Sequence, residues 1–484
     1  MRPRHTILMA SSDTPVSRPQ KLPPHVVTHT KSSILCSSSQ RMLSRLQSYD
    51  MVFAPFHSMF ANTILLDCRR FGDSHRLRMF VLCHNLWYTV INSSAMPLSI
   101  FHIEGNNIMK IITVRKPKEM KAFVRLPHTL HKNNPCFVPP IWADEKKAYY
   151  AKNNPILKNS DFELFLLLDD SGAAVGRTIA YIDHTFNRYY HVKTGFFGAF
   201  ECIKDEKAGQ MLVEAAEDWL LKNGMQTVRG PIHPAAENWG FVYLGYDTPP
   251  VYMSPWNPEY YHAFFTESGY EAAKDLFVYE ADIQNGYKLP KRLDDFVERF
   301  THRYPSINIR QLNMRSIRDD AKAIWEISNT AFAENWGYVP LELSVMEDML
   351  KKLKLIVNPD AVWMVEDGGK PVGYCLGFPD INVILSRIKG RLLPLGWFKL
   401  LTGVKSLRDY RLFGLAVHPD WQGKALDALM YINLYKNLLA KKVRMEANYI
   451  LEDNLPIRNA LEKLGMQHCK TYRIYEKPLT FYHN

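Results

Sequence analysis

Residues 412–427 read LFGLAVHPDWQGKALD. The apolar run that ends at Val417 predicts a strand, the polar residues after it predict a tight turn, and the apolar spacing from Leu426 predicts a long helix. A helix that starts after such a turn presents free backbone N–H groups and the positive end of its dipole, which together favour an anion. The pattern indicates an α/β protein with an anion site, although a β–turn–helix unit without a ligand fits the same residues.

Four short patterns occur twice, in the same order, with the second occurrence about 200 residues after the first. One such match could be chance, but four in register indicate that a unit of domain size has been duplicated. The paired stretches are 134–139 with 335–340, 169–176 with 366–373, 267–270 with 463–466, and 278–280 with 474–476.

Each copy is predicted to run strand, helices, a two-stranded hairpin, strand, long helix, strand, short helix, strand. This alternation predicts mixed α/β sheets covered by helices. We therefore expect a first domain at 109–285, a charged connector at 286–306 and a second domain at 307–484. The second domain carries an insertion at 382–411 between its hairpin and the strand that begins the quoted stretch.

Residues 1–108 differ from the rest of the chain. They contain 11 Lys and Arg against 5 Asp and Glu, without a helical or strand period. We expect either a disordered or targeting extension, or a misassigned start with translation beginning at Met109. An apolar core typical of a secretory signal is missing near Arg2–Arg4, and the apolar run 79–91 is too short for a good membrane span.

The composition of the chain limits the classes of function that we expect. The chain has 484 residues, 46% of them hydrophobic, and a formal net charge of +11. Its seven cysteines show no CxxC or Cys/His ligand spacing, so we expect reduced thiols, a cytoplasmic protein and no metal. The modest positive charge left after residue 108 and the lack of a basic aromatic motif argue against nucleic acid.

The turn Gln422-Gly423-Lys424-Ala425-Leu426-Asp427 resembles the pyrophosphate-binding turn of the GNAT acyltransferases, which hold acyl-CoA there. Asn454 and Glu462-Lys463-Leu464-Gly465 match the pattern that follows in these proteins. Ala425 stands where they carry a glycine, and Leu461 stands where many carry the tyrosine that protonates the leaving thiolate. An alanine at that turn is tolerated if its φ is negative.

More of the chain, residues 109–484, resembles a family of tandem GNAT proteins that includes the bacterial ceramide synthases. The resemblance implies two tandem GNAT domains and transfer of a fatty acyl group from a thioester to the amine of a sphingoid long-chain base. The motifs that carry it are Asn134-Pro135-x-Phe137-Val138-Pro139-Pro140, Gly195-Phe196-Phe197-Gly198-x-Phe200-Glu201, Asn257-Pro258-x-Tyr260-Tyr261, Asn335-Trp336-Gly337-Tyr338-Val339-Pro340, Gly423-Lys424-x-Leu426-Asp427-Ala428-Leu429 and Leu451-Glu452-Asp453-Asn454.

The resemblance places acyl-CoA or acetyl-CoA, as cosubstrate, in the second copy. It implies that the backbone of Leu415, Ala416 and Val417 holds the pantetheine, and that Gln422, Gly423, Lys424, Ala425 and Leu426 bind the pyrophosphate. The first copy lacks this turn, since its helix starts with Asp205-Glu206, which would cap a helix but repel a phosphate. We therefore interpret the first copy as a degenerate, substrate-shaping or structural partner.

The acceptor amine must lose a proton before it attacks a thioester, so a carboxylate is required. Glu446, on the strand beside the cofactor strand, is the first candidate and Glu452 the second, although a structural ion pair is as common a role for either. We expect Asn454 to orient the pantetheine or a water and Tyr472 to protonate the thiolate. Trp336 and Tyr338 are expected to line the acceptor pocket.

The segment 383–411 has seven Lys and Arg and one acidic residue, interleaved with Leu, Ile, Trp397 and Phe398. Such a segment suits peripheral contact with an anionic membrane surface. A helical pair packed on the other domain is the alternative, because Gly390, Pro394 and Gly396 interrupt any single amphipathic helix. Two other functions stay open: a catalytically inactive GNAT pair that binds CoA or lipid or serves as a scaffold, and an acetyltransferase of a small amine.

Overall fold

The computed structural model describes residues 109–234, 238–354 and 356–480. The expectations for residues 1–108 lie outside the described residues. Within those ranges, no helix is long and apolar enough to cross a bilayer. The same ranges hold no group of three or more His, Cys, Asp or Glu side chains placed to share a metal ion.

The first copy follows the predicted order. The hairpin of β2 and β3 closes through an acidic turn in which Asp169 accepts from Ala173 N at 2.8 Å and Gly172 takes a φ of +79°. The elements are β1 (Lys110–Thr113), α4 (Pro117–His131), α5 (Trp142–Ala148), α6 (Pro155–Lys158), β2 (Ser160–Leu168), β3 (Ala174–Asp183), α7 (His184–Tyr190), β4 (Thr194–Cys202), α8 (Glu206–Lys222), β5 (Thr227–Gly230), β6 (Phe241–Leu244), α9 (Tyr261–Glu267) and β7 (Glu271–Asp282).

The second copy repeats this order after a connector that contains α10 (Phe296–Arg303). Where the sequence predicts helices across 316–357, the structure has two, separated by the loop that holds Trp336 and Tyr338. The elements are β8 (Ile307–Gln311), α11 (Ile317–Ala331), α12 (Leu343–Leu353), β9 (Val362–Asp367), β10 (Lys370–Pro379), α13 (Asn382–Ile388), α14 (Gly396–Gly403), β11 (Asp409–Val417), α15 (Leu426–Leu438), β12 (Arg444–Leu451), α16 (Leu455–Lys463) and β13 (Gln467–Pro478).

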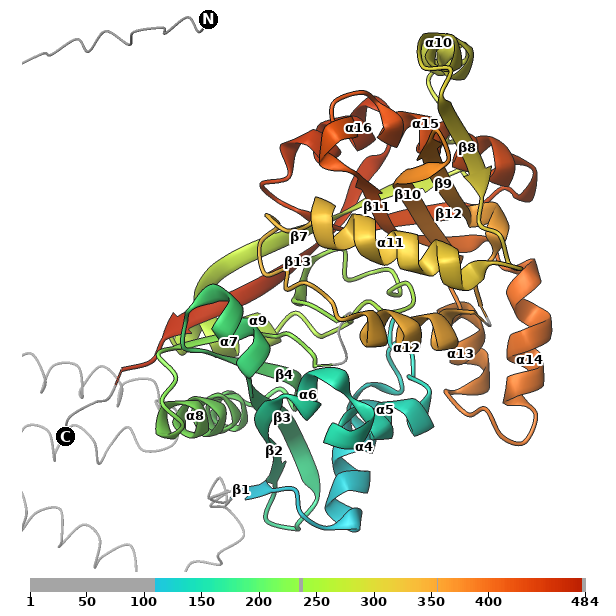
Figure 1. The fold of residues 1–484 in the computed structure, drawn as a ribbon. Coiled ribbons are helices and arrows are strands. Elements are labelled where there is room, and N and C mark those ends of the chain that lie inside the picture. The colour runs from blue at the N-terminus through green and yellow to red at the C-terminus, as the bar shows by residue number, and fades with distance from the viewer. Residues whose placement is uncertain (1–108, 235–237, 355, 481–484) are drawn as a thin grey trace, which may run out of the picture. The chain divides into compact units, whose positions relative to one another are not determined.

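The strands of the described residues all join one 13-stranded sheet in which the two copies exchange their last strands. The strand β7 ends the first copy but pairs with β12 of the second, while β13 ends the second copy but pairs with β5 of the first. The two exchanged strands also pair with each other, antiparallel, and run side by side in Figure 1. The sheet order is β1-β2-β3-β4-β5-β13-β7-β12-β11-β10-β9-β8, with β6 on β13.

Helices cover both faces of the second half of the sheet. Successive strand residues point to opposite faces, and Met364 packs with α11 while Val365 packs with α15. The buried apolar face of α15 includes Leu429 and Leu434, which share one core with β9, β10, β11 and β12. The face covered by α15 is thus filled by apolar side chains. Polar side chains of β11 and β12 can therefore gather on the opposite face, which α11 covers.

The insertion after β10 is divided between two environments. The helix α13 packs in one apolar cluster with Val138 and Ile141 of the first copy, and Trp142 Nε1 donates to the carbonyl of Lys389 at 2.9 Å. The segment that follows leaves large apolar side chains in solvent. The exposed fractions are 79% for Leu393, 64% for Leu395, 48% for Trp397, 54% for Phe398 and 44% for Leu401. The sequence left open that the insertion is a helical pair packed on the other domain. That alternative describes only the half of the insertion that contains α13.

Candidate active site

The parallel strands β11 and β12 separate part-way along their length. They pair from Asp409 with Arg444 to Leu412 with Ala447, and no further. The rest of β11, including Leu415, Ala416 and Val417, pairs with β10 alone. The backbone polar groups on the β12 side of these residues are therefore available to a ligand, as an extended pantetheine arm requires.

The turn between β11 and α15 leaves the helix start without a side-chain cap. Its first helical residue is Leu426, and Ala425, at the N-cap position, makes no side-chain cap hydrogen bond. The Lys424 ammonium donates to the carbonyl of Asp420 at 2.8 Å and lies 4.2 Å from the Trp421 ring centre, while Gln422 Nε2 donates to Val417 O at 3.3 Å. These contacts shape an exposed turn around free donors, which fits a pyrophosphate.

The first copy has the same strand separation, but its own side chains fill it. Strands β4 and β5 pair only over Thr194–Phe196. Beyond that point the phenol of Tyr261 accepts from Cys202 N at 2.9 Å, and the phenol of Tyr260 donates to Cys202 O at 2.7 Å. Asp205 accepts from Ala208 N at 2.7 Å and so caps α8. The gap and the helix start that would hold a cofactor are both occupied.

Four buried polar side chains gather where β11 and β12 separate, on the face toward the first copy. They are Arg411 of β11, Glu446 and Asn448 of β12, and Tyr472 of β13, none more than 2% exposed. Each has one polar atom without a hydrogen-bond partner among the described residues: Arg411 Nε, Glu446 Oε2, Asn448 Oδ1 and Tyr472 Oη. Buried polar atoms are nearly always paired, so these four atoms are candidates for contact with a ligand or a buried water, as are six others among the described residues, including Arg177 Nε and His233 Nδ1 of the first copy.

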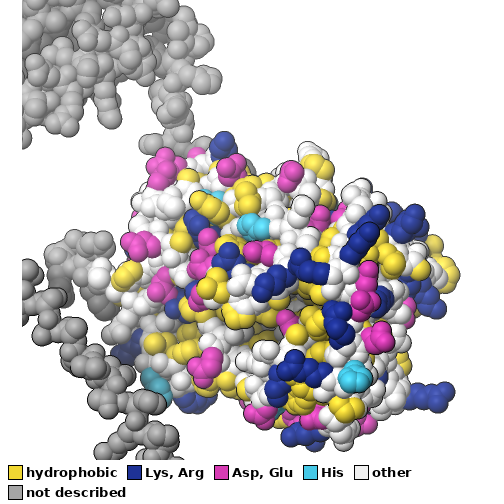
Figure 2. Space-filling model, turned by 90° about the horizontal axis from the view of Figure 1, so that it is seen from above, with side chains coloured by type: hydrophobic (Ala, Val, Ile, Leu, Met, Phe, Trp, Pro, Cys, Tyr) yellow, Lys and Arg dark blue, Asp and Glu magenta, His cyan; other side chains and the backbone are white. Residues whose placement is uncertain are grey.

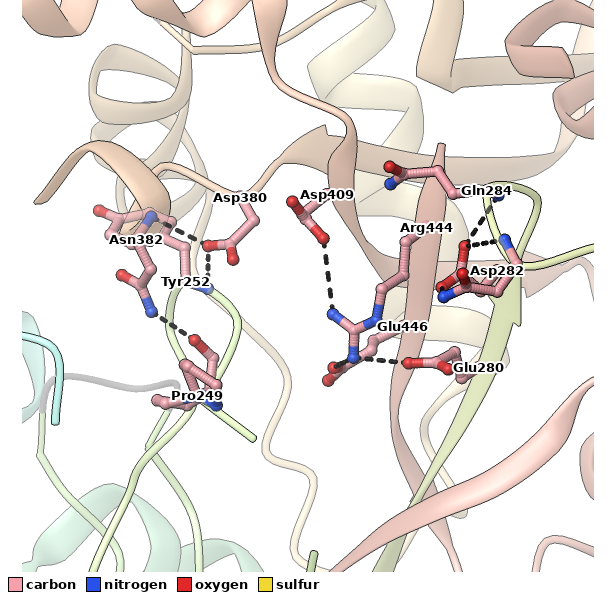
Figure 3. A network of polar contacts seen from close by, with 12 residues as sticks. Pro249, Tyr252, Glu280, Asp282, Gln284, Asp380, Asn382, Asp409, Arg444 and Glu446 are labelled. Carbon is pink, nitrogen blue, oxygen red and sulfur yellow. Dashed lines mark hydrogen bonds and ion pairs between the residues drawn. The ribbon is translucent and has the colours of Figure 1, made fainter. Parts of the chain in front are cut away.

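The two carboxylate oxygens of Glu446 have different surroundings. Oε1 accepts from the guanidinium of Arg444 and from Lys470 Nζ at 3.1 Å. Figure 3 shows Arg444 placed between Glu446, Glu280 and Asp409, so one cation serves three carboxylates. This network fixes the carboxylate group and leaves Oε2 as the oxygen that could accept a proton.

Tyr472 lies at the centre of the strand exchange. Burial raises the pKa of its phenol well above the usual value, Tyr449 and the charge of Glu446 raise it further, and the charge of Arg411 opposes the shift only in part. The phenol therefore stays protonated at any physiological pH and is a proton donor. Ser254 comes from the first copy, and its hydroxyl accepts from Asn448 Nδ2 at 3.0 Å.

Comparison with known proteins identifies the family. No family model matches the chain. The bacterial ceramide synthase of Caulobacter vibrioides (strain NA1000 / CB15N) is 32% identical over 392 residues, which cover 77% of this chain and 98% of that protein. The chain belongs to the bacterial ceramide synthase family. Protein YghO of Escherichia coli (strain K12) is 29% identical over 76% of this chain and 95% of its own length.

Membership of the ceramide synthase family confirms the family and the acyltransferase class predicted from the sequence. Among solved structures, a tandem GNAT protein from the clavulanic acid biosynthesis pathway aligns with 77% of this chain and 99% of its own, at 11% identity and a TM-score of 0.46.

Two residues that the sequence predicts in the active site, Glu452 and Asn454, lie away from the buried polar cluster around Glu446. Glu452 is six residues along from Glu446, roughly 20 Å in a strand; it accepts from Asp275 N at 3.2 Å and lies 3.7 Å from Lys274 Nζ. The side-chain oxygen of Asn454 accepts from Ile457 N at 3.3 Å and caps α16. The charge of Glu446 acts on the phenol of Tyr472, whereas Glu452 and Asn454 make contacts of their own at the far end of β12.

The two aromatic candidates for the acceptor pocket separate as well. Trp336 packs in the same apolar cluster as Tyr472, with the guanidinium of Arg229 at 4.8 Å from its ring centre. Tyr338 donates to Asn329 Oδ1 at 2.7 Å, and its carbonyl accepts from Tyr190 at 2.7 Å, so it ties the α11–α12 loop to the first copy. Only Trp336 shares a cluster with the proposed proton donor.

Sequence reasoning missed Arg411, Asn448 and Ser254. Arg411 carries a signal, because it shares one face of its strand with Phe413, Leu415 and Val417, whereas Asn448 shares its face with the polar Arg444 and Glu446. Ser254 carries none, because its contact with Asn448 joins residues 194 positions apart.

The turn residue Ala425 supports a first prediction. An alanine fits this turn without cost only if its φ is negative, but the φ of Ala425 is +64°. Ala425→Gly should raise the free energy of unfolding by about 1 kcal/mol, because the left-handed region strains an L side chain. Urea unfolding measures the difference. Lys442, with a φ of +50°, is the matched control: Lys442→Gly should stabilise similarly without altering CoA affinity. An Ala425→Gly protein no more stable than the parent would contradict the strain argument.

Proposed function

We propose that this protein transfers a long-chain acyl group from acyl-CoA to the primary amine of a sphingoid long-chain base. One observation carries the proposal. A carboxylate oxygen without a hydrogen-bond partner and a protonated phenol belong to the same buried cluster, beside the point where β11 and β12 separate. Acyl transfer to an amine needs both a proton acceptor and a proton donor. The name of the Caulobacter relative supplies the substrate class.

The proton movements follow from the cluster. The acceptor arrives as an ammonium and gives one proton to Glu446 Oε2, which frees the nitrogen lone pair. The nitrogen then bonds to the thioester carbon, the carbon–sulfur bond breaks, and the sulfur takes a proton from Tyr472. The second proton of the nitrogen is lost as the amide forms and restores the phenol through solvent. The products are an N-acyl amine, free CoA and one released proton.

The cosubstrate would lie along the open edge of β11. The start of α15 and Lys424 would hold the pyrophosphate, and the unpaired backbone of Leu415, Ala416 and Val417 would hold the pantetheine. Trp336 would border the acceptor beside Tyr472. The first copy, whose own gap is filled, would close the other side of the site through the loop that carries Ser254.

We further propose that the outer half of the insertion contacts the membrane surface. Exposed Leu393, Trp397 and Phe398 lie in the same segment as Arg391 and Lys399, a combination that suits an interface with anionic headgroups. Figure 2 shows that the face seen from above mixes Lys, Arg, Asp and Glu side chains with hydrophobic ones. An enzyme whose substrates both carry long chains gains access to them from such a position.

The membrane proposal predicts a loss of vesicle binding. The triple change Leu393→Ser, Trp397→Ser and Phe398→Ser should weaken binding to phosphatidylserine vesicles about 100-fold, since each partly buried apolar side chain contributes on the order of 1 kcal/mol. Vesicle sedimentation measures it. The matched control is Leu439→Ser, because Leu439 is also exposed but lies outside the insertion. Equal binding by the triple variant and the parent would remove this surface from consideration.

The acyltransfer proposal is tested with the full chain, acyl-CoAs of increasing length and a sphingoid base. Free CoA is followed together with the N-acyl product by mass spectrometry. Long-chain amide is the expected result. Amide formed only from acetyl-CoA and a small amine would favour the acetyltransferase alternative, and CoA binding without turnover would favour an inactive binding protein.

A further inference from the structure

The guanidinium of Arg411 is buried without a carboxylate partner among the described residues. Its Nη1 donates to the carbonyls of Tyr252, at 2.9 Å, and Met253, at 2.6 Å. Among the residues that the structure describes, its Nη2 makes only a long contact of 3.5 Å with the carbonyl of Asn448, and its Nε has no hydrogen-bond partner. Donors on the edge of the guanidinium that is formed by Nε and Nη2 are therefore available.

Two comparisons show that Arg411 is unusual in lacking a carboxylate partner and not in its unpaired Nε, since Arg177 Nε is also without a hydrogen-bond partner among the described residues. Arg177, the buried arginine of the first copy, lies 3.6 Å from Glu145 and 3.9 Å from Glu201. Arg411 has a carboxylate directly opposite, because Glu446 is its register partner on β12. No ion pair joins them, since Glu446 turns toward Arg444 and Lys470 instead. A buried cation with unused donors beside a carboxylate with an unused oxygen fits a ligand that carries both polarities.

The position of Arg411 identifies the part of the ligand that it faces. Arg411 is one residue before Leu412, where the pairing of β11 with β12 ends. A cosubstrate held with its pyrophosphate at α15 and its arm along Val417 to Phe413 follows about 15 Å of strand. The reacting end of an extended arm then reaches the point of strand separation, next to Arg411.

We propose that Arg411 binds the carbonyl oxygen of the thioester and stabilises the negative charge that forms on it. The inference rests on the proposed function. When the amine nitrogen bonds to the carbonyl carbon, the C=O π pair moves onto oxygen, and Nε–H and Nη2–H donate to that oxygen. When the C=O bond reforms, the carbon–sulfur bond breaks and CoA leaves. The guanidinium keeps its protons throughout, so Glu446 and Tyr472 alone carry the proton transfers.

The same geometry gives the first copy a function in the second copy's site. The carbonyls of Tyr252 and Met253 hold Nη1, so they fix which edge of the guanidinium faces the strand separation. This loop is itself held, because Asp380 accepts from Tyr252 N at 2.7 Å and Asn382 Nδ2 donates to Pro250 O at 2.8 Å. The first copy thus positions the charge-stabilising residue.

The test compares Arg411→Lys and Arg411→Met with the matched variant Arg177→Met. Loss of one preorganised donor to a developing oxyanion lowers kcat by about 10²- to 10³-fold. We expect losses of that size for both Arg411 variants. Affinity for a thioether analogue of acyl-CoA, which has no carbonyl, should stay within about threefold of the parent, because the analogue forms no contact to lose. Arg177→Met should lower stability without a selective loss of kcat. Circular dichroism and thermal unfolding establish which variants fold.

Each outcome separates the two proposals. A folded Arg411→Lys protein with a kcat near that of the parent overturns this inference and leaves the acyltransfer proposal intact. Equal losses of kcat and of thioether affinity also overturn it, because they would assign Arg411 to binding of the cosubstrate. If the parent forms no amide from any amine, the proposed function itself fails. If Arg411→Met does not fold, Arg411→Lys decides, since it retains the charge and changes only the donor geometry.

Discussion

Replacing Glu446 by glutamine is expected to lower kcat by about 10²- to 10⁴-fold, the range that a positioned general base contributes. The amide keeps the size of the side chain and an oxygen for Lys470, but it cannot take a proton from the acceptor. The loss should appear in single-turnover reactions with a saturating long-chain acyl-CoA, where product release does not limit the rate. It should shrink as the pH approaches the pKa of the acceptor amine, because more of the amine then arrives without its proton.

The ion-pair network provides the control. Glu280 shares Arg444 with Glu446 but has no place in the buried cluster. Glu280→Gln disturbs the same cation and should leave kcat within a fewfold of the parent. If Glu280→Gln and Glu446→Gln lose activity equally, then the network as a whole is needed for folding of the site, and the assignment of Glu446 Oε2 as the base is lost.

Asp380 is expected to make the protein less stable as the pH rises from about 4 to 7. Burial raises the pKa of this carboxyl to about 7 in the folded protein, whereas an unfolded aspartate titrates near 3.9. Between these values the unfolded chain has released the proton and the folded protein still holds it, so folding becomes less favourable as the pH rises. The full effect has an upper bound of about 4 kcal/mol.

Asp380→Asn should remove this dependence. The asparagine oxygen can still accept from Tyr252 N and Asn382 N, and it does not titrate. Urea unfolding at pH 5 and pH 8 should then give nearly equal free energies, with the variant more stable than the parent at pH 8. The control is Asp360→Asn, which breaks a half-exposed pair with Lys441 and should leave the slope of the parent unchanged. A parent whose stability does not fall between pH 5 and pH 8 would contradict the argument.

The fold could be predicted largely from local patterns. The alternation in the hairpin strands and the helical spacing after Leu426 gave element bounds close to those observed, and the duplicated motifs gave two copies of one unit. The exchange of β7 and β13 could not be predicted. Strand periodicity specifies which side of a strand is buried and says nothing about which neighbour it pairs with, and the two strands have equivalent patterns at 278–280 and 474–476.

The site was predictable only where its residues lie close in sequence. The turn proposed to bind phosphate follows from one stretch of chain, and Glu446 from its place on the neighbouring strand. The surroundings of these residues depend on contacts between distant segments, such as that of Arg411 with Met253, 158 residues apart. The Asn454 cap of α16 shows the converse: a conventional cap at a helix start explains that residue's contacts without reference to a substrate.

The exchanged strands have a consequence for how this protein could have arisen and how it can be divided. Two copies that complete each other's sheets have the architecture of a domain-swapped dimer contained in one polypeptide. In a dimer of identical chains both cofactor gaps must change together. Once fused, one gap could be filled by Tyr260 and Tyr261 while the other stayed open. A break between the copies would leave each half without a strand that completes its sheet, so neither half is a module that recombination could move by itself.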